Sequence, residues 1–129
     1  MKKTTEQLLA KAIDAIEAAE LLLTAGKSAI SAGRAYYALF YIAEALLFER
    51  GLEFRKHGGV HAAFGEHLVK TGEFGAKFHR YILDAFESRQ EAEYGVDIVL
   101  EEQAVLEMIR RAKEFLSTSR EYLANKGEK

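Results

Sequence analysis

Residues 28–50 read SAISAGRAYYALFYIAEALLFER, and this stretch decides the fold class. Placed on a helix with about 3.6 residues per turn, it is apolar on nearly every side, whereas a surface helix carries a single apolar stripe. It contains no proline, and Gly51 follows it as a natural helix terminator. We therefore expect residues 28–50 to form the central helix of a bundle.

Amphipathic segments on both sides of this stretch supply the surrounding helices. Residues 4–26 carry apolar side chains at three- and four-residue steps, Thr4 and Gln7 have capping-box spacing, and Gly26 ends the pattern. Residues 52–59 are expected to form a loop, 60–71 a short helix, and 74–93 and 101–124 two long helices. Asp97 is a candidate cap for the last helix, and residues 125–129 should fray. The sequence thus predicts an all-α, antiparallel up-and-down bundle with four long helices plus one short helix.

Length and composition indicate one ordinary soluble domain covering residues 1–129. The chain is 49% hydrophobic and 29% charged, and it has no cysteine, which excludes disulfides, thiolate zinc sites, iron–sulfur clusters and a cysteine nucleophile. No export signal is recognisable, and the richest apolar run, 35–47, is too short and too charged to span a bilayer. We expect a cytoplasmic protein without a membrane partner and without a cofactor.

The net charge of −2 conceals an uneven distribution along the chain. Formal charges give −1 for residues 1–49, +3 for 50–80 and −4 for 81–129, and all four histidines lie in the middle segment. Two interpretations are open: a polar connector, or a local anion-binding patch on an otherwise acidic protein.

Two polar stripes on otherwise apolar helices are candidate site residues. Arg34, Tyr37, Tyr41 and Glu44 share one face of residues 28–50, and Arg89 continues the inward stripe of residues 74–93. A buried arginine needs a partner, and Glu93 is one turn beyond Arg89. Arg89 can therefore be a structural ion-pair organiser. Alternatively, it is held in a cleft to receive a phosphate, with Tyr94 as stacking surface or proton donor.

The histidines offer weaker patterns. His57 and His61 are four residues apart, but no third metal ligand is near in sequence, so no metal site is predicted and solvated or hydrogen-bonded histidines are expected. Arg50 precedes His57, and Arg55 precedes His61, at spacings that could combine phosphate binding with proton transfer. About 0.7 such pairs are expected by chance, so these two pairs carry little information.

Three motifs in order, Arg34-Ala-Tyr36-Tyr37-Ala-Leu-Phe40, Lys56-His57-Gly58-Gly59-Val60 and Arg89-x-x-Ala92-Glu93-Tyr94, resemble the small stand-alone prokaryotic branch of the HEPN superfamily. The resemblance implies a helical bundle that dimerises and is often encoded beside a minimal nucleotidyltransferase. Many relatives act as metal-independent ribonucleases in toxin–antitoxin and defence systems. Their Arg-x(4–6)-His motif is matched by Arg89, but Tyr94 occupies the histidine position.

These observations lead to a ranked set of functional hypotheses. The first is a homodimeric binding module whose cleft, with Arg34, Tyr37, Arg89, Tyr94 and His57 as candidate residues, receives a nucleotide, an RNA phosphate or a nucleotidyltransferase partner. The alternative is an active metal-independent ribonuclease toxin with Arg89 and Tyr94 as catalytic residues. A non-catalytic scaffold is the third hypothesis. The 8 Phe and 6 Tyr, more than one small core obviously requires, favour a dimer.

Overall fold

The regular structure is helical throughout residues 1–95 and 99–127, the part of the chain that the computed structural model describes. The four long helices are α1 (Lys3–Thr24), α2 (Ser28–Glu49), α4 (Ala76–Tyr94) and α5 (Glu102–Gly127). The short helix α3 (His57–Phe64) continues into one π-helical turn, Gly65–Val69. The predicted all-α bundle of four long helices and one short helix is confirmed.

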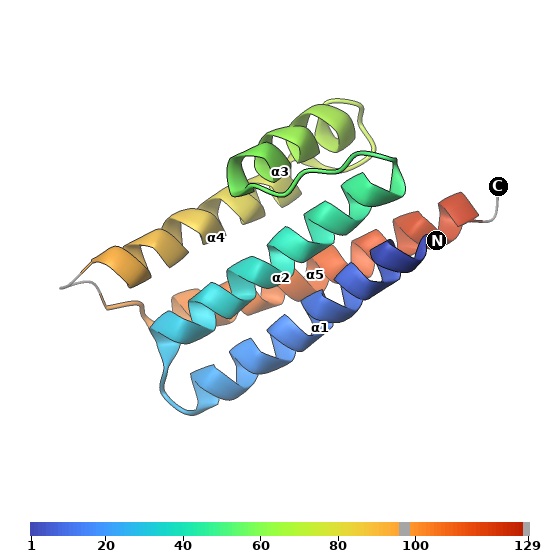
Figure 1. The fold of residues 1–129 in the computed structure, drawn as a ribbon. Helices are drawn as coiled ribbons and strands as arrows, with labels where there is room; N and C mark the ends of the chain where they lie inside the picture. Colours follow the sequence, from blue (N-terminus) through green and yellow to red (C-terminus); the bar gives the residue numbers. More distant parts are fainter. Residues whose placement is uncertain (96–98, 128–129) are drawn as a thin grey trace.

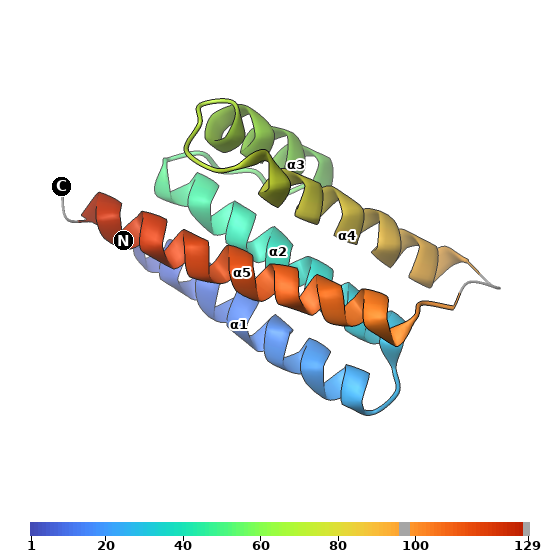
Figure 2. The ribbon, with the colours of Figure 1, turned by 180° about the vertical axis from the view of Figure 1, so that it is seen from behind.

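Helix α2 lies in the middle of the bundle and packs against α1, α3, α4 and α5. Helices α1 and α4 run antiparallel to α2, while α5 returns along the back of the molecule between them (Figures 1 and 2). The up-and-down order brings the start of α2 and the end of α4 to the same end of the bundle (Figure 1). Residues about 55 positions apart in sequence therefore become neighbours there.

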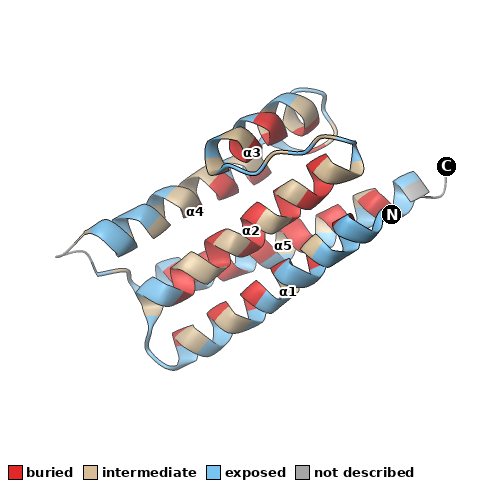
Figure 3. Ribbon diagram, in the orientation of Figure 1, coloured by how far each residue is buried: buried red, intermediate tan, exposed pale blue. Residues whose placement is uncertain are grey.

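Burial explains the central position of α2. Its buried residues number 12 of 22 and occur on most sides of the helix, whereas α1 shows an exposed outer face in Figure 3. Tyr36, Leu39, Ile42 and Leu46 are completely buried. At roughly 25 cal/mol per Å² of apolar surface, burial of this kind is the main favourable contribution to folding. The all-round apolar pattern of residues 28–50 is thus the expected signature of this helix.

Two glycines allow the long helices to end sharply. Gly26 and Gly51 have φ values of +80° and +81°, a left-handed conformation that is unfavourable for side-chain-bearing residues. At the end of α1 the N–H of Lys27 donates to the carbonyl of Leu22, which closes the helix as a Schellman motif does. The chain can then reverse within three residues into α2.

The start of α1 and the end of α5 differ from the sequence prediction. Helix α1 begins at Lys3 with Lys2 as its N-cap and without a side-chain cap, so the capping box predicted at Thr4 is wrong. The neighbouring Thr5 instead donates a 2.8 Å hydrogen bond to Glu49, which ties α1 to the end of α2. Helix α5 extends to Gly127, so the tail is helical over residues 125–127. Asp97, the predicted cap of α5, and residues 128–129 lie outside the described residues.

The loop predicted for residues 52–59 is also too long at its C-terminal end. Helix α3 starts at His57 rather than at residue 60, and its first turn is closed by the N–H of Val60 donating to Lys56. Both Gly58 and Gly59 are therefore helical despite the low helix propensity of glycine. The shift places His57 and His61 on one helix, four residues apart.

Half of the 14 Phe and Tyr side chains are buried in this chain's own core, and five more are partly buried against it. Phe115 stacks on Phe78 at 5.2 Å between ring centroids and meets Phe64 edge to face at 5.4 Å. The buried aromatic residues are Tyr36, Phe40, Phe64, Phe74, Phe78, Tyr81 and Phe115. The aromatic content is thus used within one chain and gives no support to a dimer.

Glu73 fastens the C-terminal part of α5 to the loop before α4. Its carboxylate accepts hydrogen bonds from Tyr122 at 2.6 Å and Thr71 at 3.1 Å, and it pairs with Arg50 and Lys126. Although burial raises its pKa, these donors outweigh burial and lower the pKa of Glu73 to about 2. Lys126, which pairs with Glu73 at 3.3 Å, lies beyond the predicted end of α5.

Along residues 1–95 and 99–127, no helix is long and apolar enough to cross a membrane.

Candidate functional site

A pocket of about 340 Å³ lies between the first turns of α2 and the last turns of α4. Its size is within the range of small-ligand sites. Small residues on both helices leave the space open, and two arginines, one tyrosine and one glutamate supply its polar groups. The lining residues are Ala29, Ile30, Gly33, Arg34, Tyr37, Arg89, Ala92 and Glu93. The structure therefore brings together Arg34, Tyr37 and Arg89, three of the predicted site residues.

Helical spacing accounts for the composition of this pocket. Gly33 and Tyr37 are four residues apart on α2, and Arg89 and Glu93 are four apart on α4, so each pair shares one helix face. Because α2 and α4 are antiparallel, the two faces meet at one end of the bundle. The meeting of the faces depends on the up-and-down topology, which the sequence predicted correctly.

Arg89 is a largely enclosed charge of the pocket. Its side chain is 16% exposed, and its guanidinium carbon lies 5.0 Å from the ring centroid of Tyr37 and 5.7 Å from that of Tyr36. Its Nε is 3.3 Å from Glu93 Oε1, close enough for an ion pair, but the N–H is not aligned for a hydrogen bond. Nε is itself closed off from solvent, but the two terminal nitrogens of Arg89 are not among the buried unpaired atoms and have no hydrogen-bond partner among the described residues, so they can donate to an anion.

Arg34 adds a second guanidinium to the pocket, from α2. It lies 4.9 Å from the ring centroid of Tyr37, so both arginines contact this ring. Among the described carboxylates none forms an ion pair with Arg34, and Glu93 is the one acidic residue lining the pocket. The pocket thus contains two positive charges and one negative charge, an excess that favours an anionic ligand.

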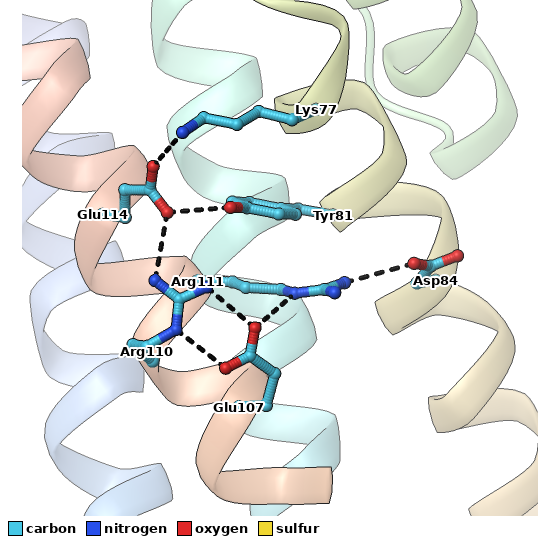
Figure 4. Close-up of polar contacts among 7 residues, drawn as sticks. All are labelled: Lys77, Tyr81, Asp84, Glu107, Arg110, Arg111 and Glu114. Atoms are coloured by element: carbon cyan, nitrogen blue, oxygen red, sulfur yellow. Dashed lines mark hydrogen bonds and ion pairs between the residues drawn. The ribbon is translucent and has the colours of Figure 1, made fainter.

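The arginines between α4 and α5 show the opposite arrangement. Figure 4 shows Arg110 and Arg111 on α5 surrounded by carboxylates from both helices. Arg110 binds Glu107 through two nitrogens, at 2.7 and 2.8 Å, and Arg111 bridges Glu107 at 3.0 Å and Asp84 at 3.1 Å. These pairs neutralise the charge locally and hold α4 against α5. They therefore leave no excess positive charge for a ligand.

The predicted Arg/His pairs of the middle segment do not form a site. Arg50 pairs with Glu73 and donates to the carbonyl of His67, and Arg55 forms an exposed 3.0 Å ion pair with Glu53. Among the described residues, Arg50 forms no hydrogen bond with His57, and Arg55 forms none with His61. The positive charge of residues 50–80 is thus partly neutralised, in line with the polar-connector interpretation.

His57 and His61 are joined by a tyrosine rather than by a metal. The hydroxyl of Tyr36 is 2.6 Å from His57 Nδ1 and 2.8 Å from His61 Nε2. Tyr36 is completely buried in α2, His61 is buried, and His57 is half-buried. No group of three His, Asp or Glu side chains suited to a metal occurs within residues 1–95 and 99–127. The histidines are hydrogen-bonded, as expected.

This cluster lies beside the arginine pocket. The His57 ring is 5.5 Å from the ring of Tyr36 and 5.7 Å from that of Tyr37, the same two rings that contact Arg89. Burial, followed by the charge of Arg89, lowers the pKa of His57. Burial, followed by His57 and His79, lowers the pKa of His61 to about 4. Both histidines are therefore neutral at pH 7.

We expect the stability of the fold to fall in mild acid because of His61. In the unfolded chain its pKa is about 6.5, so the unfolded state binds a proton that the folded state excludes until the pH reaches about 4. The free energy of unfolding should be highest above pH 6.5 and fall by about 3 kcal/mol between pH 6.5 and pH 4.

Urea denaturation at several pH values in this window measures the effect. His57, whose pKa is also lowered, contributes in the same direction. His61→Gln should flatten the pH dependence, while His67→Gln, a change at a histidine outside the Tyr36 cluster, should leave it unchanged. Equal pH dependence in all three proteins would contradict the burial of a neutral His61.

Gly33 forms part of the pocket wall, although an alanine would suit the helix better. A Cβ built at this position meets no atom within 4 Å. We expect Gly33→Ala to raise the free energy of unfolding by about 0.5–1 kcal/mol, because glycine is unfavourable inside a helix. The added methyl group should weaken ligand binding severalfold, since it enters the pocket. Gly58→Ala, which also meets no atom, is the matched control for stability and should leave binding unchanged.

Tyr94 does not join the other predicted site residues. Its side chain is 78% exposed at the last position of α4, and it is absent from the described lining of the pocket. Five residues on a helix turn the side chain about 140° away from Arg89, which accounts for the separation. Sequence reasoning missed Tyr36 and His61 as site residues. A tyrosine on an apolar helix face needs a hydrogen-bond partner, and this was the available signal.

A second groove, about 360 Å³, lies between α1 and α5 and has a different character. Its wall contains Leu23, Leu106 and Ile109, and the Lys113–Glu20 ion pair of 2.7 Å crosses it. Its charges are balanced by pairing, so it has no feature that selects an anion.

Comparisons with known proteins identify the family of the chain. A family model described as "HEPN domain" matches residues 5–122. The chain is 38% identical over 115 residues to a "UPF0332 protein" of Thermotoga maritima, covering 89% of this chain and 87% of the relative. It is 30% identical over 125 residues to "Putative toxin MJ0142" of Methanocaldococcus jannaschii, covering 97% and 85%. A "UPF0332 protein" of Gloeobacter violaceus is 30% identical over 125 residues, covering 96% and 99%.

Proposed function

This chain belongs to the HEPN family, and from that premise we propose that it binds a phosphate-bearing ligand, a nucleotide or single-stranded RNA, in the pocket between α2 and α4. The observation that carries the proposal is the pair of arginines, Arg34 from α2 and Arg89 from α4, that line one pocket with a single carboxylate, Glu93. Tyr37, in contact with both arginines, offers a ring on which a base can stack.

The biological setting that we propose is a toxin-like protein paired with a nucleotidyltransferase. Two relatives from Methanocaldococcus jannaschii carry the word toxin in their names. The small HEPN proteins that this chain resembles are often encoded beside a minimal nucleotidyltransferase, an enzyme that itself handles nucleotides. We propose that such a partner binds near the pocket, where its nucleotide can reach Arg34 and Arg89. Identification of the adjacent gene is the direct check.

Titration of a labelled single-stranded RNA, followed by fluorescence anisotropy, tests the binding proposal, with AMP and ATP as competitors. Phosphate contacts release counterions, so the logarithm of the binding constant should fall with the logarithm of salt concentration. If Arg34 and Arg89 each neutralise one phosphate, the slope should be about −1.4. Absence of binding by RNA and by both nucleotides at low salt would refute the proposal.

We also propose a homodimer, and the end of the bundle near the pocket is its best surface. Leu21 is 73%, Ile30 58%, Val99 81% and Leu106 44% exposed, and all four lie where α1 meets α2 and where α5 begins. Exposed apolar side chains gathered in one region are typical of an interaction surface. Light scattering at micromolar concentration should give the mass of two chains, about 29 kDa from 14.5 kDa each, and Ile30→Asp should reduce it toward that of one chain.

RNA cleavage without a metal is the second candidate function. The observation that favours it is the Tyr36–His57–His61 cluster, which brings proton-transferring groups to the edge of an arginine pocket. In the mechanism that the family motif suggests, Arg89 binds the phosphate and Tyr94 transfers the proton. Tyr94→Phe keeps the ring and removes the hydroxyl, so a loss of cleavage in EDTA would support that role. Unchanged cleavage would exclude it.

A further inference from the structure

We propose that His57 is the proton acceptor for cleavage of RNA bound at the arginine pocket, and that Tyr36 and His61 position its ring. This inference rests on the proposed binding of RNA. It differs from the motif-based role of Tyr94 because it assigns proton transfer to a residue of α3. His57 is not among the residues that line the pocket, but it contacts the rings of Tyr36 and Tyr37, as Arg89 does, and the charge of Arg89 acts on it.

The hydrogen-bond chain leaves one ring nitrogen of His57 available. Nδ1 faces the Tyr36 hydroxyl at 2.6 Å. Nε2 has no partner within residues 1–95 and 99–127. The unpaired buried polar side-chain atoms of this part are Arg89 Nε and Ser119 Oγ, so His57 Nε2 retains contact with solvent. It is therefore the nitrogen that an incoming ribose hydroxyl can reach.

Because the hydroxyl of Tyr36 has a single proton, it can donate to only one of the two histidines, and this sets the direction of the hydrogen bonds between His57, Tyr36 and His61. When Nδ1 of His57 carries the proton, it donates to the oxygen of Tyr36, and the hydroxyl of Tyr36 donates to Nε2 of His61. Nε2 of His57 is then unprotonated and can accept a proton. The neutral state of His61 is needed, because a protonated His61 would donate to Tyr36 and reverse the chain. This is the arrangement of a base oriented by a second group that is oriented by a third.

The charged and titratable groups around His57 come from three helices. Tyr36 and Tyr37 face it from α2, His61 from its own helix α3, and Arg89 from α4. His79 of α4 contacts the backbone of His61, and its Nε2 lies 3.1 Å from the carbonyl oxygen of His61. Burial and the Arg89 charge keep His57 neutral at pH 7, which is the form that a proton acceptor requires.

The reaction balances without a metal or another reactant. His57 Nε2 takes the proton of a ribose 2′-hydroxyl, and the 2′-oxygen attacks the adjacent phosphorus. The bond from phosphorus to the 5′-oxygen breaks, and the leaving oxygen takes a proton from water. His57 then returns its proton to solvent. The products are a 2′,3′-cyclic phosphate and a 5′-hydroxyl end, while Arg89 neutralises the charge that develops on the phosphoryl oxygens.

The test uses a labelled single-stranded RNA of mixed sequence in EDTA and the DNA of the same sequence. The wild-type protein should bind both, cleave only the RNA, and leave 5′-hydroxyl ends that a polynucleotide kinase can label. His57→Ala should bind RNA within about threefold of wild type and cleave it at least 100-fold more slowly. His67→Ala, a histidine outside the cluster, should cleave at the wild-type rate. His57→Gln, whose amide can still donate to the oxygen of Tyr36, replaces His57→Ala if that variant does not fold.

The positioning role has a separate signature in the pH profile. The cleavage rate should rise with pH as His57 loses its proton and then reach a plateau. Tyr36→Phe removes the acceptor that stabilises the charged imidazolium, so the acid limb should move to lower pH and the plateau should fall about tenfold. An unchanged pH profile in Tyr36→Phe would overturn the positioning role. RNA binding without cleavage, or wild-type cleavage by both His57 variants, would overturn the role of His57, whereas absence of RNA binding would instead refute the proposed function.

Discussion

Replacement of Arg89 by alanine is expected to weaken the binding of RNA and nucleotides by about 10- to 150-fold. A hydrogen bond to a charged group contributes about 1.5–3 kcal/mol, and each 1.4 kcal/mol corresponds to a factor of ten. The side chain of Arg89 is 16% exposed, and its Nε is buried without an aligned hydrogen bond. Its removal also leaves Arg34 as the one positive charge against Glu93, so the pocket loses its excess positive charge. Anisotropy titration at fixed salt measures the change.

Arg80→Ala is the matched control for this experiment. Arg80 is on the same helix, is 69% exposed, and forms a long 3.8 Å pair with Asp84, so its removal changes the net charge equally without touching the pocket. Its binding constant should stay within about twofold of wild type. Arg89→Lys separates charge from geometry, because a lysine keeps the charge but loses the planar fork of donors. If Arg80→Ala and Arg89→Ala weaken binding equally, binding depends on overall charge and not on the pocket.

Replacement of Tyr36 by alanine is expected to lower the free energy of unfolding by about 3–5 kcal/mol. Tyr36 is completely buried, and loss of a large buried aromatic side chain leaves a cavity whose cost is of this size. The change also removes the hydroxyl that both His57 and His61 contact, which leaves the buried His61 without that partner. Urea denaturation at pH 7 gives the value directly.

Tyr94→Ala serves as the comparison, since it removes the same side chain from a position that is 78% exposed. A surface change of this kind should alter the free energy of unfolding by less than about 0.5 kcal/mol. Similar losses in the two variants would mean that Tyr36 is not the buried centre of the cluster. If both variants lose less than about 0.5 kcal/mol of unfolding free energy, the hydrogen bonds of Tyr36 to His57 and His61 do not contribute to stability.

The architecture could be predicted because the relevant signals are local. The apolar residues 28–50 required a central helix, and glycines at 26 and 51 marked where helices end. The starting point of α3 could not be predicted in the same way. Gly58 and Gly59 have low helix propensity, and they are helical because the segment packs on α2 and on Phe54, whose ring would lie 3.6 Å from a Cβ at Gly59. Tertiary packing of this kind is not visible in a short sequence window.

The candidate site was predictable to the extent that it follows helix periodicity. Arg34 and Tyr37 share a stripe, Arg89 and Glu93 share another, and the antiparallel topology brings the two together. The partners of Tyr36 depend instead on how α3 is rotated against α2, and no spacing within either segment encodes that rotation. Tyr94 was selected by its position in a family motif, and helix geometry directs it away from the pocket.

The interaction of a phosphate with Arg34 and Arg89 can be observed directly by NMR. Arginine side chains give separate Nε–Hε signals, and the eight arginines of this chain can be assigned by single substitutions. Addition of AMP or a short RNA should shift the signal of Arg89 most strongly and that of Arg34 next, because these two line the pocket. The signals of Arg110 and Arg111, which are held by carboxylates, should remain in place. Shifts confined to arginines outside the pocket, with Arg34 and Arg89 unchanged at saturation, would contradict phosphate binding between α2 and α4.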